Sequence, residues 1–185
     1  MTASPAAPPS LAGLIYRMRE PVDDILEEIR ALAAAEGARL GGVVQRRHPR
    51  PGGGRNALIA REINGAWEIP ILQFRGGGAR GCKLDPHAIT EIAARLEAGI
   101  DARTDLLIIN RFGRAEAESQ GLRGVFERAA ALEIPLLVAV REDYRQPWQA
   151  FHGGMGTELP LDRAAVVGWW RAVARTGPRS EARAG

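Results

Sequence analysis

Two unbroken apolar runs constrain the fold of this chain more than any other feature. They read DLLIIN at 105–110 and IPLLVAV at 134–140. A strand with one face in water alternates apolar and polar residues, whereas a strand buried on both faces of a parallel sheet is apolar throughout. Stretches with helical character separate and follow the two runs. The chain is therefore predicted to form a three-layer α/β domain with a mainly parallel sheet.

The other elements follow from periodicity and from turn residues. A strand is expected at 11–17, a helix at 21–37 that begins at a proline and stops at a glycine, and a second strand at 39–45. Two further runs, at 56–62 and 67–73, flank Asn64-Gly65 and predict an inserted hairpin with a two-residue turn. Helices are expected over 86–98, from about Glu116 to Glu133, and over 166–174.

Length and composition narrow the organisation of the chain. The 185 residues fit one domain, expected over 11–175, with disordered tails at 1–10 and 176–185. A single cysteine allows no internal disulfide and suits the reducing cytoplasm. No apolar run approaches the roughly 20 residues that cross a bilayer, so no membrane association is expected. Arginine gives the chain its pI near 9.7. Nucleic acid is nevertheless not an expected partner, because no aromatic residues accompany the basic loop at 46–55.

The segment FRGGGARGCKLDP at 74–86 is the first candidate site. It combines four glycines, two arginines, the only cysteine and the only lysine between an expected strand and an expected helix. Backbone N–H groups, guanidinium groups and a helix N-terminus together favour a bound oxyanion. The alternative interpretation is a surface turn. It accounts for Asp85 as a helix cap and for Pro86 in the first helical turn. The candidate ligand-binding residues here are Arg75, Gly77, Gly78, Arg80, Gly81, Cys82 and Lys83.

Cys82 allows two interpretations. A lone cysteine is more often a packed apolar side chain than a ligand. Between Arg80 and Lys83 its thiolate is favoured, and a soft sulfur could bind a metal, so Cys82 is also a candidate metal ligand.

The second candidate site is NRFGRAE at 110–116. It follows the apolar run at 105–110, and ligands of parallel α/β sheets bind at the carboxyl ends of the strands. Asn110, Arg111 and Glu116 are its candidate ligand-binding residues. The same rule directs attention to the residues that follow Ile15, Gln73 and Val140.

The order of these motifs resembles two families. EGARLGGVVQ, the basic loop ending GGGR, the hairpin, GCKLDPHAITEIA and LLIINRFGRAEAESQGLRGVF resemble, in pattern and order over 11–141, the P-loop nucleoside triphosphatases of the thermophilic and cancer-related kind. GARGCKLDP and NRFG followed by Glu more closely resemble a bacterial family known as domain of unknown function 2478. The first resemblance implies a P-loop-like fold. The second implies a link to molybdenum, because members are often encoded near genes for molybdate transport or nitrogen fixation.

The triphosphatase motifs are degenerate in this chain. The place of the Walker A loop reads YRMREPVDDI, with no glycine, lysine, serine or threonine, and with Glu20, Asp23 and Asp24 where a triphosphate would sit. Asn110 and Arg111 stand where the resembled family has an Asp-Glu pair for magnesium and water. An amide is a poor magnesium ligand, and an arginine repels the cation. Standard Mg-ATP binding is therefore not expected, and the chain is expected not to be a triphosphatase.

These observations favour a non-hydrolytic protein that binds a small anionic ligand through the loops 74–86 and 110–116, with molybdate as the leading ligand. Two alternatives remain open. One is a nucleotide-dependent phosphohydrolase or transferase with a non-standard site. The other is a regulatory module that contacts a protein partner or a second copy of itself.

Overall fold

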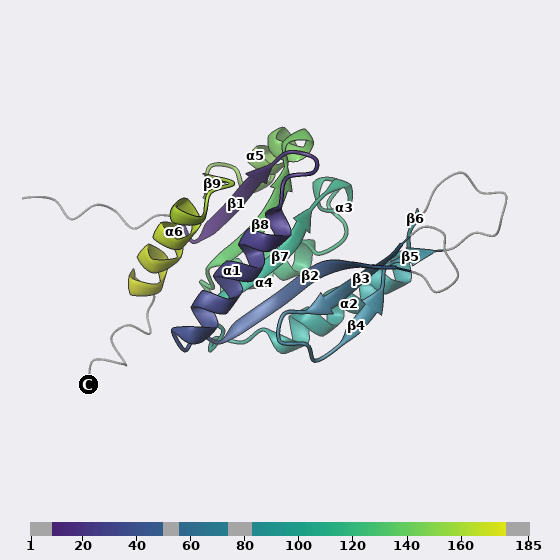
Figure 1. Ribbon diagram of the computed structural model, residues 1–185, viewed down its shortest axis with the longest axis horizontal. Coiled ribbons are helices and arrows are strands. Elements are labelled where there is room, and N and C mark those ends of the chain that lie inside the picture. Colours follow the sequence, from purple (N-terminus) through teal and green to yellow (C-terminus); the bar gives the residue numbers. More distant parts are fainter. Residues whose placement is uncertain (1–8, 50–55, 74–82, 177–185) are drawn as a thin grey trace, which may run out of the picture.

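A computed structural model of the chain describes residues 9–49, 56–73 and 83–176 (Figure 1). Its main sheet has seven strands in the order β4-β3-β2-β7-β8-β1-β9. The parallel part comprises β2 (Leu40–His48), β7 (Leu106–Phe112), β8 (Leu136–Arg141), β1 (Leu11–Tyr16) and β9 (Gly156–Pro160). Strands β3 (Ala57–Glu62) and β4 (Glu68–Pro70) extend this sheet in antiparallel fashion beside β2.

Helices cover both faces of the sheet. One face packs against α1 (Val22–Ala35) and α6 (Arg163–Thr176), and the other against α2 (Pro86–Gly99), α4 (Arg123–Ala131) and α5 (Arg145–His152). Strand β7 contributes to both cores: Leu106 and Ile108 face α1, whereas Leu107 and Ile109 face the opposite layer, and none of the four is exposed. The predicted three-layer α/β fold with a mainly parallel sheet is confirmed, and it agrees with a P-loop-like arrangement.

The helix ends that the sequence predicts from capping residues, proline and glycine are found in the structure. Asp85 caps α2 by accepting a hydrogen bond from the His87 backbone N–H at 3.0 Å, directly before Pro86 in the first turn. Gly37 follows α1 with φ of 80°, a backbone conformation that glycine adopts at little cost. The two ends of the described chain are also tied together, because Trp169 of α6 donates a hydrogen bond from Nε1 to the carbonyl of Pro9 at 2.9 Å.

The two-residue hairpin turn predicted at Asn64-Gly65 is wrong. Strands β3 and β4 pair from Arg61 with Glu68, and the Glu62 N–H donates to the carbonyl of Trp67, so residues 63–66 form a longer connection. The Glu62 carboxylate accepts hydrogen bonds from the backbone N–H groups of Asn64 and Ala66 and stabilises this wider turn. Ile63 is buried against the α1 layer, and its burial favours the longer connection over a tight one.

Two other expected elements differ in extent. The run at 67–73 is divided into β4 and a separate two-stranded sheet, in which β5 (Leu72–Gln73) pairs with β6 (Lys83–Leu84). Between them Ile71 is buried, and its N–H donates to the carbonyl of Leu58. Strand β2 continues through Arg46, Arg47 and His48 because β3 pairs with them, so the basic loop begins later than expected.

The single helix expected from Glu116 to Glu133 is two helices, α3 (Arg114–Ala117) and α4. Between them Ser119 and Gly121 adopt left-handed conformations with φ of 61° and 66°, which interrupt the helical path. The last strand, β9, has no counterpart among the predicted elements. Its sequence, GTELP, is short and weakly apolar, and only its pairing with β1 makes it a strand.

Candidate functional site

A bulge in β7 creates the site at the carboxyl end of the sheet. Ile109 pairs with Val138 and Phe112 with Val140, so Asn110 and Arg111 together oppose Ala139 of β8. Two consecutive residues opposite one is the pattern of a β-bulge, which redirects side chains. Both side chains therefore reach toward the α1 layer, where Asn110 contacts α1 and Arg111 contacts β1. The peptide bond between Asn110 and Arg111 is cis.

Tyr16, the last residue of β1, lies at the centre of this cluster. Its hydroxyl accepts a hydrogen bond from Arg111 Nη1 at 2.6 Å, and the guanidinium carbon lies 5.6 Å from the centre of its ring. Burial raises the pKa of Tyr16 above its ordinary value, while the nearby charges of Arg111 and Arg141 act to lower it. At neutral pH the hydroxyl keeps its proton and can donate it in a hydrogen bond.

Arg141 brings a second cation to the same place. It ends β8 in direct register with Tyr16 of the neighbouring β1. Its Nη2 pairs with Asp143 at 2.8 Å, and its guanidinium carbon lies 5.5 Å from the centre of the Tyr144 ring. The Nε atoms of Arg111 and Arg141 are both buried, and neither has a hydrogen-bond partner among the residues that the structure describes.

Asp23, in the first turn of α1, closes the cluster on its acidic side. Its Oδ1 accepts a hydrogen bond from Asn110 Nδ2 at 2.5 Å. Asn110 is almost fully buried, at 2% exposure, while Asp23 is exposed. The cluster thus combines two guanidinium groups, a phenol, an amide and a carboxylate, contributed by β1, β7, β8 and α1.

The connection between β1 and α1 is a short turn that the carboxylate of Glu20, a residue of the turn itself, stabilises. The Glu20 carboxylate accepts a hydrogen bond from the backbone N–H of Arg17 at 2.6 Å, and the Glu20 N–H donates to the carbonyl of Arg17 at 3.1 Å. A phosphate cradle needs free backbone N–H groups at this position. Here a carboxylate already accepts from the Arg17 N–H, and Asp23 adds negative charge at the start of the helix.

Glu116, a predicted ligand-binding residue, organises its own loop. Its two carboxylate oxygens accept hydrogen bonds from the backbone N–H groups of Gly113, at 3.0 Å, and Leu122, at 3.2 Å. The side chain is 7% exposed. Gly121 passes so close that a β-carbon there would collide with Glu116 Oε1. These contacts give Glu116 a structural role in joining α3 to α4, and its role toward a ligand stays a prediction.

Most of the other predicted site lies outside the described residues. This applies to Arg75, Gly77, Gly78, Arg80, Gly81 and Cys82; of Lys83 only the backbone is described, paired with Gln73 in the small β5–β6 sheet. Whether the 74–86 loop reaches the Asn110–Arg111 cluster therefore stays a prediction. In the described ranges, no group of three or more His, Cys, Asp or Glu residues is arranged to hold a metal ion. The candidate metal ligand, Cys82, is not among them.

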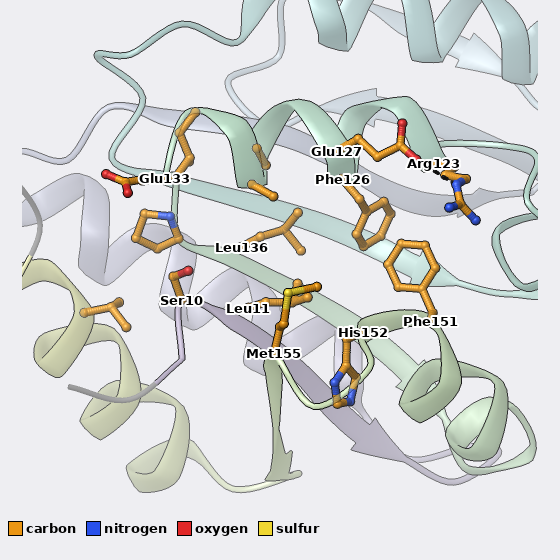
Figure 2. Close-up of a pocket in the computed structure, with 15 residues that line it drawn as sticks. Ser10, Leu11, Arg123, Phe126, Glu127, Glu133, Leu136, Phe151, His152 and Met155 are labelled. Carbon is orange, nitrogen blue, oxygen red and sulfur yellow. Dashed lines mark hydrogen bonds and ion pairs between the residues drawn. The ribbon is translucent and has the colours of Figure 1, made fainter. Parts of the chain in front are cut away.

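A separate pocket of about 590 Å³ opens at the amino ends of β1 and β8 (Figure 2). Its lining is mainly apolar and includes Leu11, Phe126, Leu136, Phe151 and Met155. His152 also contributes, and its Nδ1 accepts hydrogen bonds from the backbone N–H groups of Gly154 and Gly156, which places the imidazole proton on Nε2. No sequence motif predicted this pocket, because its walls come from segments that are distant in sequence.

The described fold and site can now be compared with known proteins. The chain matches the family described as "Protein of unknown function (DUF2478)" over residues 11–169. The protein belongs to this family. The match to the DUF2478 family spans all the strands of the described main sheet and both Asn110 and Arg111, so it covers the part of the chain that carries the cluster.

A named relative of this DUF2478 chain is a much longer protein. Over 164 residues, covering 89% of this chain, the sequence is 34% identical to "Molybdenum import ATP-binding protein ModC 2" of Bradyrhizobium diazoefficiens, strain USDA 110. The chain spans only 18% of that relative's length. No solved structure matches the chain. No helix in the described part of the chain is both long enough and apolar enough to span a membrane.

In this DUF2478 member, the carboxyl-end rule predicted the region where the cluster lies but not all the residues that form it. The carboxyl-end rule selected the segments after Ile15, Gln73, Ile109 and Val140. Tyr16, Asn110 and Arg141 directly follow three of these residues, and Arg111 follows Asn110. Sequence reasoning did not identify Tyr16 or Arg141 as site residues, and it treated Asp23 only as a repulsive charge. The sequence signal that could have identified Tyr16, Arg141 and Asp23 is the position of each residue at the end of a strand or helix. The contacts that Asn110 and Arg111 make with this cluster depend on the bulge in β7.

Proposed function

We propose that this protein binds a tetrahedral oxyanion at the carboxyl ends of β1, β7 and β8 without hydrolysing a nucleotide. One observation carries the proposal: the Nε atoms of Arg111 and Arg141 are buried without partners among the described residues, beside the Tyr16 hydroxyl. A buried donor left unpaired costs about 1–3 kcal/mol. An oxyanion supplies several acceptor oxygens at once and carries the charge that guanidinium groups prefer.

Molybdate is the first candidate ligand. The relative that shares 34% identity is named for molybdenum import, and the segment that matches this chain is less than a fifth of it. A role of the matched segment in handling the imported oxyanion accounts for its presence in such a protein. The single cysteine suits a protein that works in the cytoplasm.

The cluster lacks the arrangement of groups that binds a nucleotide together with magnesium. The β1–α1 turn uses the Glu20 carboxylate to close itself, and Asp23 stands at the helix start where a phosphate would bind. Asn110 donates its amide to Asp23, and Arg111 donates to Tyr16. Neither residue is arranged to bind magnesium or to activate water.

Calorimetric titration at fixed ionic strength tests the proposal. The purified protein is titrated separately with molybdate, with sulfate and with ATP plus magnesium. We expect both oxyanions to bind, molybdate more tightly than sulfate, and no heat from ATP. Binding of ATP alone would overturn the proposal in favour of a nucleotide-dependent enzyme, and no binding of any of the three would favour a protein-interaction module.

Two arginine variants make the test specific to the cluster. Arg111→Gln removes a cationic donor and should weaken molybdate binding at least tenfold, because a hydrogen bond to a charged group contributes about 1.5–3 kcal/mol. Arg114→Gln is the matched control: its side chain is 79% exposed and pairs with Glu118 on the surface of α3. Equal affinities of the two variants would place the anion elsewhere.

A further inference from the structure

The cluster at the strand ends contains hydrogen-bond acceptors as well as donors. Asp23 extends from the first turn of α1, and its Oδ1 accepts the hydrogen bond from Asn110 Nδ2. A carboxylate has about four acceptor positions, so this one bond leaves most of them open. Because Asp23 is exposed, a ligand in the cluster can reach it.

Asn110 adds a second acceptor. A carboxylate only accepts, so the contact with Asp23 assigns the NH₂ side of the amide and places Oδ1 on the other side. Oδ1 is buried and has no partner among the described residues. The buried amide therefore fixes the orientation of Asp23 and leaves a further acceptor unmet in the same region.

An oxyanion without a proton cannot satisfy this mixture of groups. Sulfate and molybdate are fully deprotonated dianions at neutral pH, and each offers only acceptor oxygens. Their oxygens match the guanidinium groups of Arg111 and Arg141 and the Tyr16 hydroxyl, but they repel the carboxylate of Asp23. A bound species with one hydroxyl matches both sets, because its O–H donates to the carboxylate.

We propose that the oxyanion is bound together with one proton, which forms a hydrogen bond between the ligand and Asp23. Tyr16, Arg111 and Arg141 donate to the remaining oxygens. This inference rests on the proposed function. It identifies the ligand class as a hydrogen-bearing oxyanion: hydrogen phosphate brings the proton itself, whereas molybdate and sulfate bind with a proton that the acid form of the buffer releases.

The charged and titratable groups around Asp23 come from several elements. Tyr16 ends β1, Arg111 lies in β7, and Arg141 ends β8 with its partner Asp143 just beyond. Glu20 and Asp24 flank Asp23 in its own segment. The three histidines of the chain belong elsewhere: His48 ends β2, His87 lies in α2, and His152 lines the apolar pocket. A change in binding between pH 6 and pH 8 therefore does not originate from an imidazole in this cluster.

Proton-coupled calorimetry tests the inference. The wild-type protein, Asp23→Asn and Asp24→Asn are titrated with sulfate, with micromolar molybdate and with phosphate at pH 6, 7 and 8. Each titration is repeated in two buffers of different ionisation enthalpy, which counts the protons taken up. Asp24→Asn is the matched control because Asp24 is the neighbouring exposed carboxylate in the same helical turn.

For the wild type we expect uptake of about one proton with sulfate or molybdate, and a Kd that rises about tenfold per pH unit. Phosphate at pH 8 should bind with no proton uptake. Asp23→Asn should abolish the uptake, flatten the pH dependence and bind sulfate at pH 8 at least tenfold more tightly than the wild type. Asp24→Asn should behave as the wild type does.

The outcomes separate the two proposals. If no anion binds to the wild type or to either variant, the proposed function itself is wrong. If the anions bind and Arg111→Gln weakens them, but Asp23→Asn leaves the proton uptake and pH dependence unchanged, the role of Asp23 alone is wrong. The role of Asp23 is also wrong if Asp23→Asn weakens the binding of all three anions equally.

Discussion

Arg111 donates a hydrogen bond to the hydroxyl of Tyr16 at 2.6 Å, although 95 positions separate the two residues in the chain. Arg111 lies in β7 and Tyr16 in β1, and β8 runs between these strands in the sheet. The contact therefore reaches across a whole strand, and it depends on the bulge that turns the Arg111 side chain toward the α1 layer. It joins the two strand ends into one cluster.

Tyr16 should ionise above about pH 10, the ordinary value for a tyrosine. Burial is the largest cause of its raised pKa. Because the chain has two tyrosines, Tyr144→Phe leaves Tyr16 as the only one, and its tyrosinate absorbance can be followed against pH. Arg111→Gln in that background should raise the midpoint further, since the cation acts to lower it. A midpoint below 10 would contradict the buried position of the hydroxyl.

The raised pKa of Tyr16 also predicts a loss of stability in alkali. The unfolded chain releases the tyrosine proton near pH 10 while the folded protein still holds it, so the free energy of unfolding falls as pH rises from there to the folded pKa. Urea unfolding of the wild type and of Tyr16→Phe between pH 9 and pH 11 measures this. The wild type should lose more stability over this range than the variant.

Glu116→Ala should lower the free energy of unfolding by about 1–3 kcal/mol, because two backbone N–H groups lose their acceptor. Chemical denaturation at neutral pH gives the value. Glu118→Ala is the control: Glu118 lies two residues away, is exposed, and pairs only at the surface with Arg114, so its loss should cost less than about 1 kcal/mol. Equal effects would show that the buried contacts of Glu116 contribute no more than a surface pair.

Gly42→Ala should destabilise the protein far more than Gly41→Ala. Gly42 has φ of 127°, and a β-carbon there would overlap the backbone carbonyl of Ile108 in the adjacent strand, which cannot move without breaking the sheet. At Gly41 a β-carbon would meet side-chain atoms of Leu107 and Thr104 at 3.2 and 3.3 Å, and these can shift slightly. We expect a cost above roughly 3 kcal/mol for Gly42→Ala and about 1 kcal/mol for Gly41→Ala, by thermal or denaturant unfolding.

The prediction that the 74–86 loop shares a ligand with the Asn110–Arg111 cluster can be tested by a double-mutant cycle. Arg80→Ala and Arg111→Ala are made singly and together, and the molybdate affinity of each protein is measured. Residues that bind one ligand should each weaken binding and show a coupling energy of about 0.5 kcal/mol or more. Additive effects would place Arg80 outside the pocket.

Sequence patterns predicted the parts of the fold that depend on local chemistry. The apolar runs at 105–110 and 134–140 are the central strands β7 and β8, and Asp85 and Pro86 begin α2 as expected. The patterns failed where a distant contact overrides local preference. Glu62 widens the turn at Asn64-Gly65, the contacts of Glu116 accompany the break between α3 and α4, and β9 exists only because β1 offers it a partner.

The sequence by itself determined the layered α/β architecture, because residue type and periodicity carry that information directly. It also predicts that the lysine and the carboxylate pair of the triphosphatase motifs are missing. It further predicts a ligand site at the ends of the parallel strands. Only the tertiary structure decided which side chains meet there. The bulge in β7 and the order of strands bring Arg111 to Tyr16 and Asn110 to Asp23, and such pairings arise from sheet register, to which no local pattern corresponds.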